Sequence, residues 1–201
     1  YSKQAAKAEL GLPLDKPLVV SVWGSLGAEN MNEVICRFIE LAGKKPGFTL
    51  IHSAGIEGYE KMVEHLRRTV PDYEKNGMDV REYIYDMPRV MAAGHLVLCR
   101  AGASTISELT DMHKPTIFVP SPFVTNNHQF KNAKVVEDAG GALIFEEGWF
   151  EPKELLKAVN DILSSDDKLE KMSAAMAKLA KPEATDMICD RIFSLLAENR
   201  K

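Results

Sequence analysis

Short apolar runs alternate with amphipathic segments along the chain as far as Trp149. The runs are rich in β-branched residues and predict strands at Leu18–Val22, Thr49–His52, Val80–Tyr83, Leu96–Cys99, Thr116–Val119 and Ala142–Phe145. They are nearly continuous rather than alternating, which is typical of strands buried on both faces of a parallel sheet. Helical patterns fall between most of them. The chain is therefore predicted to be an α/β protein whose Rossmann-like parallel sheet has about six strands, with helices on both faces.

Only helical patterns follow Trp149, so residues 150–201 are predicted to form C-terminal helices, the last two of which Pro182 separates. Apolar side chains recur at helical spacing in two groups, which are Leu155, Val159, Ile162 and Leu163, and Ile188, Ile192, Leu195 and Leu196. The chain starts with Tyr1, and a helical pattern from Lys3 to Leu10 precedes the first strand. We expect residues 1–201 to be a single domain cut from a longer protein, with residues 1–15 as an interdomain connection.

The composition is that of a globular protein of one domain, with 201 residues of which 45% are hydrophobic. A net charge of −4 gives no reason to expect a nucleic-acid partner. No apolar segment approaches the ~18 residues that a membrane span needs. Cys36, Cys99 and Cys189 lie far apart in apolar contexts, which indicates three buried free thiols in a reducing, cytoplasmic compartment.

Two strand-to-helix turns have the composition of phosphate-binding turns. In the first, Gly24 and Gly27 follow the strand 18–22 and allow the backbone to turn tightly, while Ser25 offers a hydroxyl to a phosphate. The spacing is that of neither the dinucleotide fingerprint nor a nucleoside triphosphatase loop. A plain glycine turn with no ligand is the alternative interpretation.

The second turn, Ala101–Ala103, follows the strand 96–99 and leads into a helix that is expected to start at Ser104 or Thr105. Its exposed N-terminus would direct backbone N–H groups at an anion. Glu108, one turn into the helix, could accept hydrogen bonds from both hydroxyls of a ribose. Alternatively, Thr105 and Glu108 form a capping box, in which the carboxylate only satisfies a backbone N–H.

In an open parallel sheet, ligands bind outside the carboxyl ends of the strands, and both turns lie there. The loop after the fifth predicted strand adds the uncharged polar groups of Asn126, Asn127, His128, Gln129 and Asn132, which suit sugar hydroxyls or, alternatively, a helix cap. His52 and His95 lie at ends of apolar strands and are predicted to be structural. No Asp-x-Asp motif and no metal-ligand spacing occurs, so neither a metal nor a cofactor is expected.

Five motifs stand in the order seen in the MurG family, which the chain resembles from about Leu18 to its C-terminus. They are Trp23-Gly-Ser-Leu-Gly-Ala28, His52-x-x-Gly55, Ile84-x-Asp-Met87, Arg100-Ala-Gly-Ala-Ser-Thr-Ile-Ser-Glu108 and Asn127-His-Gln-x-x-Asn-Ala133. This family comprises the bacterial transferases that make lipid II from lipid I and UDP-GlcNAc in peptidoglycan synthesis. The resemblance implies the C-terminal, donor-binding half of a two-domain GT-B glycosyltransferase.

The resemblance also implies a role for each matching residue. Gly24, Ser25 and Gly27 would hold the diphosphate, Ile84 would pair with the uracil edge through its backbone with Met87 nearby, and Ala103, Ser104 and Thr105 would contact the nucleotide at the helix N-terminus. Glu108 would bind the ribose, while His128, Gln129 and Asn132 would line the GlcNAc side of the site. Two residues depart from the family pattern: Trp23 replaces a glycine, and His128 replaces the first of two glutamines.

We therefore expect the UDP-GlcNAc-binding half of an inverting glycosyltransferase, with no catalytic residue in this chain. Its partners would be the UDP-GlcNAc donor, the missing N-terminal acceptor domain and, through that domain, lipid I at the cytoplasmic face of the inner membrane. The alternatives are a subunit of a two-chain GlcNAc transferase acting on a dolichol diphosphate lipid, a UDP-GlcNAc 2-epimerase-like GT-B protein, and a non-catalytic module that binds a nucleotide sugar.

Overall fold

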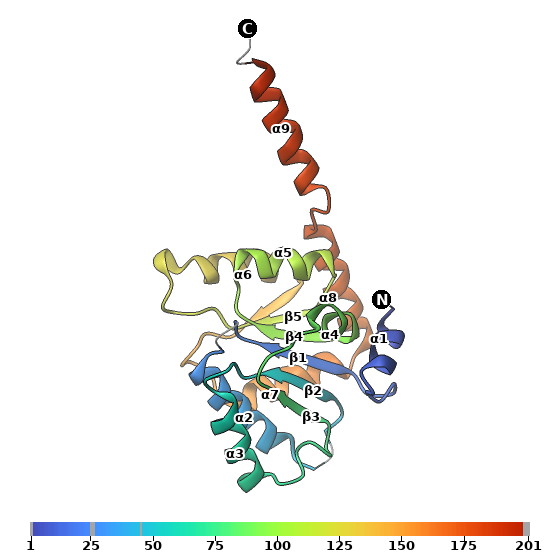
Figure 1. Ribbon diagram of the computed structural model, residues 1–201, viewed down its shortest axis with the longest axis vertical. Coiled ribbons are helices and arrows are strands. Elements are labelled where there is room, and N and C mark those ends of the chain that lie inside the picture. The colour runs from blue at the N-terminus through green and yellow to red at the C-terminus, as the bar shows by residue number, and fades with distance from the viewer. Residues whose placement is uncertain (1, 25–26, 45, 199–201) are drawn as a thin grey trace.

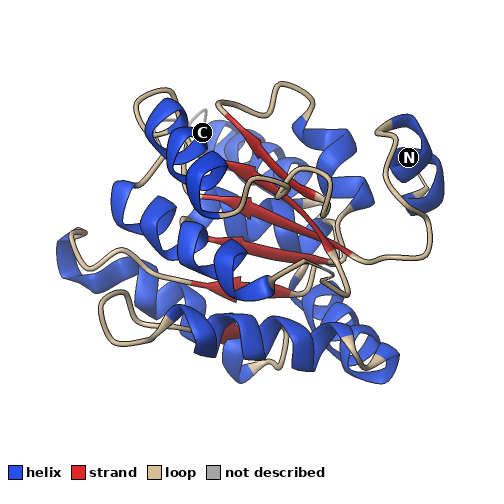
Figure 2. Cartoon of the chain, turned by 90° about the horizontal axis from the view of Figure 1, so that it is seen from below, coloured by secondary structure: helices blue, strands red, loops and turns tan. Residues whose placement is uncertain are grey.

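A six-stranded parallel sheet forms the centre of the protein, and helices cover both of its faces (Figures 1 and 2). The computed structural model describes residues 2–24, 27–44 and 46–198. The strands are β1 (Leu18–Val22), β2 (Thr49–Ser53), β3 (Met78–Arg81), β4 (Leu96–Cys99), β5 (Thr116–Phe118) and β6 (Ala142–Ile144). The predicted α/β class, Rossmann-like parallel sheet and approximate positions of the strands are confirmed.

One strand is displaced from its predicted position. β3 starts at Met78 and ends at Arg81, whereas the apolar run had suggested residues 80–83. Its neighbour β2 sets these limits, because Met78 pairs with Leu50 and Arg81 pairs with Ser53, the last residue of β2. Beyond this point the chain leaves the sheet and Ile84 is buried in the core below it.

Helices connect the strands and follow the last of them. They are α1 (Lys3–Glu9), α2 (Glu29–Ala42), α3 (Tyr59–Thr69), α4 (Met87–Ala93), α5 (Ala103–Asp111), α6 (His128–Asp138), α7 (Pro152–Leu163), α8 (Asp166–Leu179) and α9 (Ala184–Glu198), with a short 3₁₀ turn η1 (Thr125–Asn127) before α6. The break between α8 and α9 contains Pro182, as predicted. No helix in the described ranges has both the length and the apolar composition needed to cross a membrane.

Two hydrophobic cores lie on opposite faces of the sheet. On one face, α2, α3 and α7 cover strand residues such as Val19 and Leu98. On the other, α1, α4, α5 and α6 cover the neighbouring residues Val20 and Val97, whose side chains point in the opposite direction. This burial on both faces explains why the apolar runs are continuous.

The strand order β3-β2-β1-β4-β5-β6 determines where a ligand can bind. The chain runs outward from β1 to β3, returns to the middle at β4, and then runs outward in the other direction to β6. The loops that follow β1 and β4 therefore diverge to opposite sides and leave a crevice between them. This topological switch point is where open parallel sheets bind ligands.

The last helix, α9, extends away from the body of the protein (Figure 1). The predicted apolar face is present, but no residue of this helix within the described range is buried, and the exposure of Ile188 is 61%. Cys189 is exposed with it, so the prediction of three buried thiols is wrong for this residue. Cys36 and Cys99 are buried as expected, on α2 and β4.

This distribution predicts one fast-reacting thiol in the native protein. Burial and the nearby Glu40 and Glu33 raise the pKa of Cys36 to about 11, and burial raises the pKa of Cys99 as well, so neither forms the reactive thiolate readily. Titration with a chromogenic disulfide reagent should therefore show a single rapid equivalent. Cys189→Ser should abolish it, and rapid reaction in that variant would contradict the expected protection of the other two.

Candidate functional site

The turn after β1 is closed by a hydrogen bond from Gly27 N to Gly24 O, at 3.2 Å. Both glycines have positive φ, of 100° at Gly24 and 77° at Gly27. A side chain at Gly27 has no space, because a Cβ there would lie 2.2 Å from the carbonyl oxygen of Ala54. The glycine is thus required by the close approach of the next strand's loop. Ser25, the predicted phosphate ligand, lies outside the described residues.

The turn after β4 starts a helix earlier than predicted. Gly102 is the N-cap of α5, and Ala103, Ser104 and Thr105 are its first three residues. The capping-box interpretation of Thr105 and Glu108 is therefore wrong, because Thr105 lies inside the helix rather than at its cap. Ser104, in the first turn of α5, and Glu108, about one turn farther along, are exposed. The carboxylate of Glu108 thus has no capping role to perform.

Two side-chain hydrogen bonds fix the loop after β5, and His128 is exposed at its end. The side-chain oxygen of Gln129 accepts a hydrogen bond from Ser121 N at 2.9 Å. Asn132 Nδ2 donates to Ala101 O at 3.3 Å, which joins this loop to the β4 turn. His128 is exposed at the start of α6, after Asn127, which has a φ of 51°. The loop therefore places His128 and Gln129 beside the β4 turn.

The loop after β3 lies at the far end of the row of predicted site residues. Ile84 is 2% exposed, so its side chain anchors the backbone that was predicted to meet a base. Met87 is the first residue of α4 and is partly buried. The exposed rings of Tyr83 and Tyr85 pack edge to face with their centroids 5.0 Å apart.

All the described site residues follow the carboxyl ends of four strands, β3, β1, β4 and β5, along one edge of the sheet. The two glycine turns, and with them the N-termini of α2 and α5, flank the switch point between β1 and β4. The caps of these helices are Ala28 and Gly102, which have no polar side chain to satisfy the first N–H groups. Such N-termini are suited to bind phosphate groups between them.

Arg100 was not assigned a role from the sequence, although it opens the longest of the five motifs. Its Nη1 atom lies 2.5 Å from Glu147 Oε2 and donates to Val119 O at 2.9 Å. Its guanidinium carbon lies 5.8 Å from the centroid of the Trp23 ring. The indole is 3% exposed, so the unexpected tryptophan is accommodated by turning into the core.

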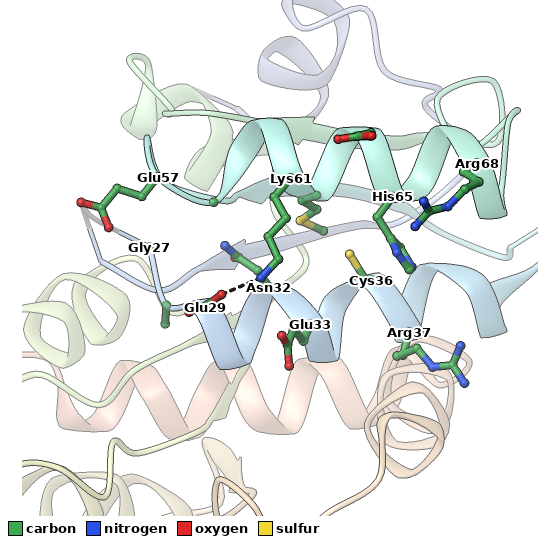
Figure 3. Close-up of a pocket in the computed structure, with 14 residues that line it drawn as sticks. Gly27, Glu29, Asn32, Glu33, Cys36, Arg37, Glu57, Lys61, His65 and Arg68 are labelled. Carbon is green, nitrogen blue, oxygen red and sulfur yellow. Dashed lines mark hydrogen bonds and ion pairs between the residues drawn. The ribbon is translucent and has the colours of Figure 1, made fainter.

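A cavity of about 770 Å³ lies between α2 and α3, beside this edge (Figure 3). Of the predicted site residues, Gly27 lines it. An ion pair between Glu29 and Lys61, at 2.6 Å, bridges the two helices that form its walls. Residues of both charge signs line the cavity. They come mostly from α2 and α3 rather than from the loops at the switch point. Within the described ranges, no group of three His, Cys, Asp or Glu side chains is placed to hold a metal ion.

The family model described as "Glycosyltransferase family 28 C-terminal domain" matches residues 18–188. The chain belongs to this family. It is 35% identical over 195 residues to the UDP-N-acetylglucosamine--N-acetylmuramyl-(pentapeptide) pyrophosphoryl-undecaprenol N-acetylglucosamine transferase of Acetivibrio thermocellus, covering 97% of this chain and 52% of the relative. The protein of the same name from Caldicellulosiruptor saccharolyticus is 39% identical over 189 residues, covering 94% and 50%.

The fold of this family 28 domain is also that of a solved relative. The crystal structure of MurG from Acinetobacter baumannii superposes with a TM-score of 0.77 at 25% identity, over 96% of this chain and 53% of that one. The domain thus has the GT-B half-fold that its resemblance to MurG had implied. It spans about half the length of the curated relatives it matches.

The two histidines at strand ends are structural, as predicted. His52 is fully buried, and burial lowers its pKa to about 3. His95 accepts a hydrogen bond from Leu18 N at 3.1 Å, and burial together with nearby lysines lowers its pKa to about 4. Both rings are therefore neutral wherever the family 28 domain is folded near neutral pH.

These histidines predict how stability depends on pH. Below about pH 6.5 the unfolded chain binds protons that the folded histidines reject, so the free energy of unfolding falls as pH drops toward 4, by up to ~1.4 kcal/mol per unit for each ring. Urea unfolding at several pH values should show that the free energy of unfolding changes less steeply with pH in His52→Gln than in the unchanged protein. The exposed His113 supplies a control as His113→Gln, and equal slopes in all three proteins would contradict the assignment.

Proposed function

We propose that this chain is the donor-binding half of an inverting glycosyltransferase that transfers GlcNAc from UDP-GlcNAc to lipid I, giving lipid II. The observation that carries the proposal is the pair of helix N-termini, of α2 and α5, on either side of the switch point. The relatives' names supply the chemistry of the donor and acceptor. Membership in a glycosyltransferase family favours transfer over the epimerase alternative.

The donor would lie across the carboxyl edge in a defined direction. Its diphosphate would bind at the turn from Gly24 to Gly27 and at the first N–H groups of α5. The ribose hydroxyls would bind Glu108, which is exposed one and a half turns into that helix. The uracil would extend toward Ile84, at the β3 end, and the GlcNAc ring toward Gln129 and His128.

The proposed chemistry divides between this chain and the part of the protein that it does not contain. An acceptor hydroxyl held by the other half would attack the anomeric carbon, with inversion, while UDP leaves. Negative charge grows on the leaving diphosphate, and the helix N-termini of this half would stabilise it without a metal ion. The base and the attachment to the cytoplasmic face of the membrane would belong to the other half.

A two-chain transferase acting on a dolichol diphosphate lipid uses the same donor chemistry and remains the second possibility. The gene decides between them, because a continuous reading frame encoding an acceptor domain upstream would exclude the two-chain arrangement. The binding experiments that follow apply to the donor site in either case.

Glu108→Ala should weaken UDP binding while leaving stability almost unchanged. Loss of two charge-assisted hydrogen bonds to the ribose costs roughly 1.5–3 kcal/mol of binding. The residue is exposed and caps nothing, so the free energy of unfolding should change by less than about 0.5 kcal/mol. Calorimetric titration with UDP, with and without EDTA, and urea unfolding measure the two effects.

Glu108→Gln is the matched variant, because it keeps one acceptor oxygen and the size of the side chain. It should lie between the unchanged protein and Glu108→Ala in affinity. A requirement for divalent metal, or full UDP affinity in Glu108→Ala, would contradict the proposed binding mode. Absence of UDP binding by the unchanged chain would contradict the proposed function of the site itself.

Gln129→Ala should lower the affinity for UDP-GlcNAc more than the affinity for UDP. Gln129 lies in the first turn of α6, toward which the sugar would extend, and loss of its amide should cost about 1 kcal/mol of sugar binding. Competition titrations with the two ligands measure the difference, with His128→Gln as a control expected to be tolerated. An equal loss for both ligands would show that Gln129 acts through its hydrogen bond to Ser121 alone.

A further inference from the structure

Three groups converge on the carbonyl oxygen of Ala54, the residue after β2. Asn32 Nδ2 donates to it at 2.8 Å. A Cβ at Gly27 would lie 2.2 Å from it, and a Cβ at Gly58 would lie 2.8 Å from it and 2.1 Å from Asn32 Nδ2. The turn after β1 and the start of α3 therefore pack directly onto this carbonyl. Figure 3 shows Gly27 and Asn32 among the residues that line the cavity between α2 and α3.

Asn32 is fixed from its other side by a buried chain of polar groups. His52 Nε2 lies 3.1 Å from Asn32 Oδ1, and His52 Nδ1 lies 2.9 Å from Ser21 Oγ. Trp23 Nε1 donates to Ser21 Oγ at 2.8 Å. The exposures of these four residues are 0% for Ser21 and His52, 3% for Trp23 and 6% for Asn32.

The hydrogen bonds that link Trp23 to Ala54 O allow one consistent arrangement of their protons. An amide oxygen can only accept, so His52 Nε2 must donate to Asn32 Oδ1. The neutral ring then accepts at Nδ1 from the Ser21 hydroxyl, which in turn accepts from the Trp23 indole. Every hydrogen bond therefore runs in the same direction, from Trp23 to the carbonyl of Ala54. This direction determines the tautomer of His52 and the orientation of the Asn32 amide.

Both ends of the chain meet the phosphate-type turn. Trp23 is the residue immediately before Gly24, and Ala54 O is the atom on which Gly27 rests. No side chain of this hydrogen-bonded chain is exposed enough to be a principal ligand contact, because all four are at most 6% exposed. These side chains instead fix the positions of Trp23, just before the turn, and of Ala54 O, against which Gly27 packs.

We infer that Asn32 is a positioning residue that, through the carbonyl of Ala54, holds Gly27 and with it the N-terminus of α2 in place for ligand binding. The inference rests on the proposed function, since the ligand is the diphosphate of the donor. A turn held in place before binding loses less conformational freedom when the ligand arrives. Removing the Asn32 link should therefore weaken recognition of phosphates and leave recognition of the nucleoside intact.

The test compares UDP with uridine, which lacks the diphosphate. Asn32→Ala removes both hydrogen bonds, and Asn32→Asp keeps the acceptor for His52 but loses the donor to Ala54. Both variants lose the bond to Ala54 O and should bind UDP roughly tenfold more weakly, with unchanged affinity for uridine. Ser21→Ala, which breaks the hydrogen-bonded chain between Trp23 and His52, should also lower the affinity for UDP.

Two control variants separate positioning from general destabilisation. Glu33→Ala alters an exposed neighbour on the same helix and should bind like the unchanged protein. Met176→Ala opens a cavity in the opposite core and should lower stability without changing UDP affinity, measured well below its unfolding temperature. Equal loss of UDP and uridine binding in the Asn32 variants, or no loss of either, would overturn the inference.

A second measurement needs no ligand and so distinguishes this inference from the proposed function. Amide hydrogen exchange at Gly27, which donates to Gly24 O, should be several-fold faster in Asn32→Ala and Asn32→Asp than in Met176→Ala. If the unchanged chain does not bind UDP, the proposed function fails, and the exchange rates still decide the positioning role. Unchanged exchange at Gly27 would overturn it.

Discussion

Burial of the sheet on both faces is the constraint on which the rest of this structure depends. β1 and β4 lie in the middle of six parallel strands, and helices must cover them from both sides. Each parallel connection needs a crossover, so the chain can fill both faces only by reversing its direction of travel along the sheet. That reversal occurs between β1 and β4 and creates the crevice. The site is thus a by-product of the way in which the core is covered.

The fold was predictable because its signal is repeated along the chain. Continuous apolar runs such as Leu18–Val22 and Leu96–Cys99 can be recognised without knowledge of their partners, and both were placed correctly. The limits of β3 were not, because the length of β2 sets them, and pairing partners cannot be read from a local pattern. The exposure of Cys189 depends in the same way on what lies beside α9, and the local pattern shows only that the helix is amphipathic.

The candidate site was predictable in its position but less so in its details. Glycine turns after β1 and β4 indicated the edge where a ligand would bind. The start of α5 at Ala103 was missed because Gly102, a weaker cap than Ser and one without a side chain, occupies the N-cap. The chain from Trp23 to Ala54 joins residues from β1, β2 and α2, and no spacing in the sequence relates them. Each of these residues can be seen in the sequence, but only the folded structure shows that they are hydrogen-bonded to one another.

Because the apolar face of α9 is exposed, the stability of this helix depends on what lies against it. Isolated helices shorter than about 12–15 residues are marginal in water, and α9 has 15 residues, none of which is buried in the described range. Met187, Ile188 and Phe193 are each more than half exposed on it. A surface that covers these side chains would add the packing that the helix lacks. The helical content of α9 should therefore depend on contact with another surface. It should rise when these apolar side chains are covered and fall when the domain is alone.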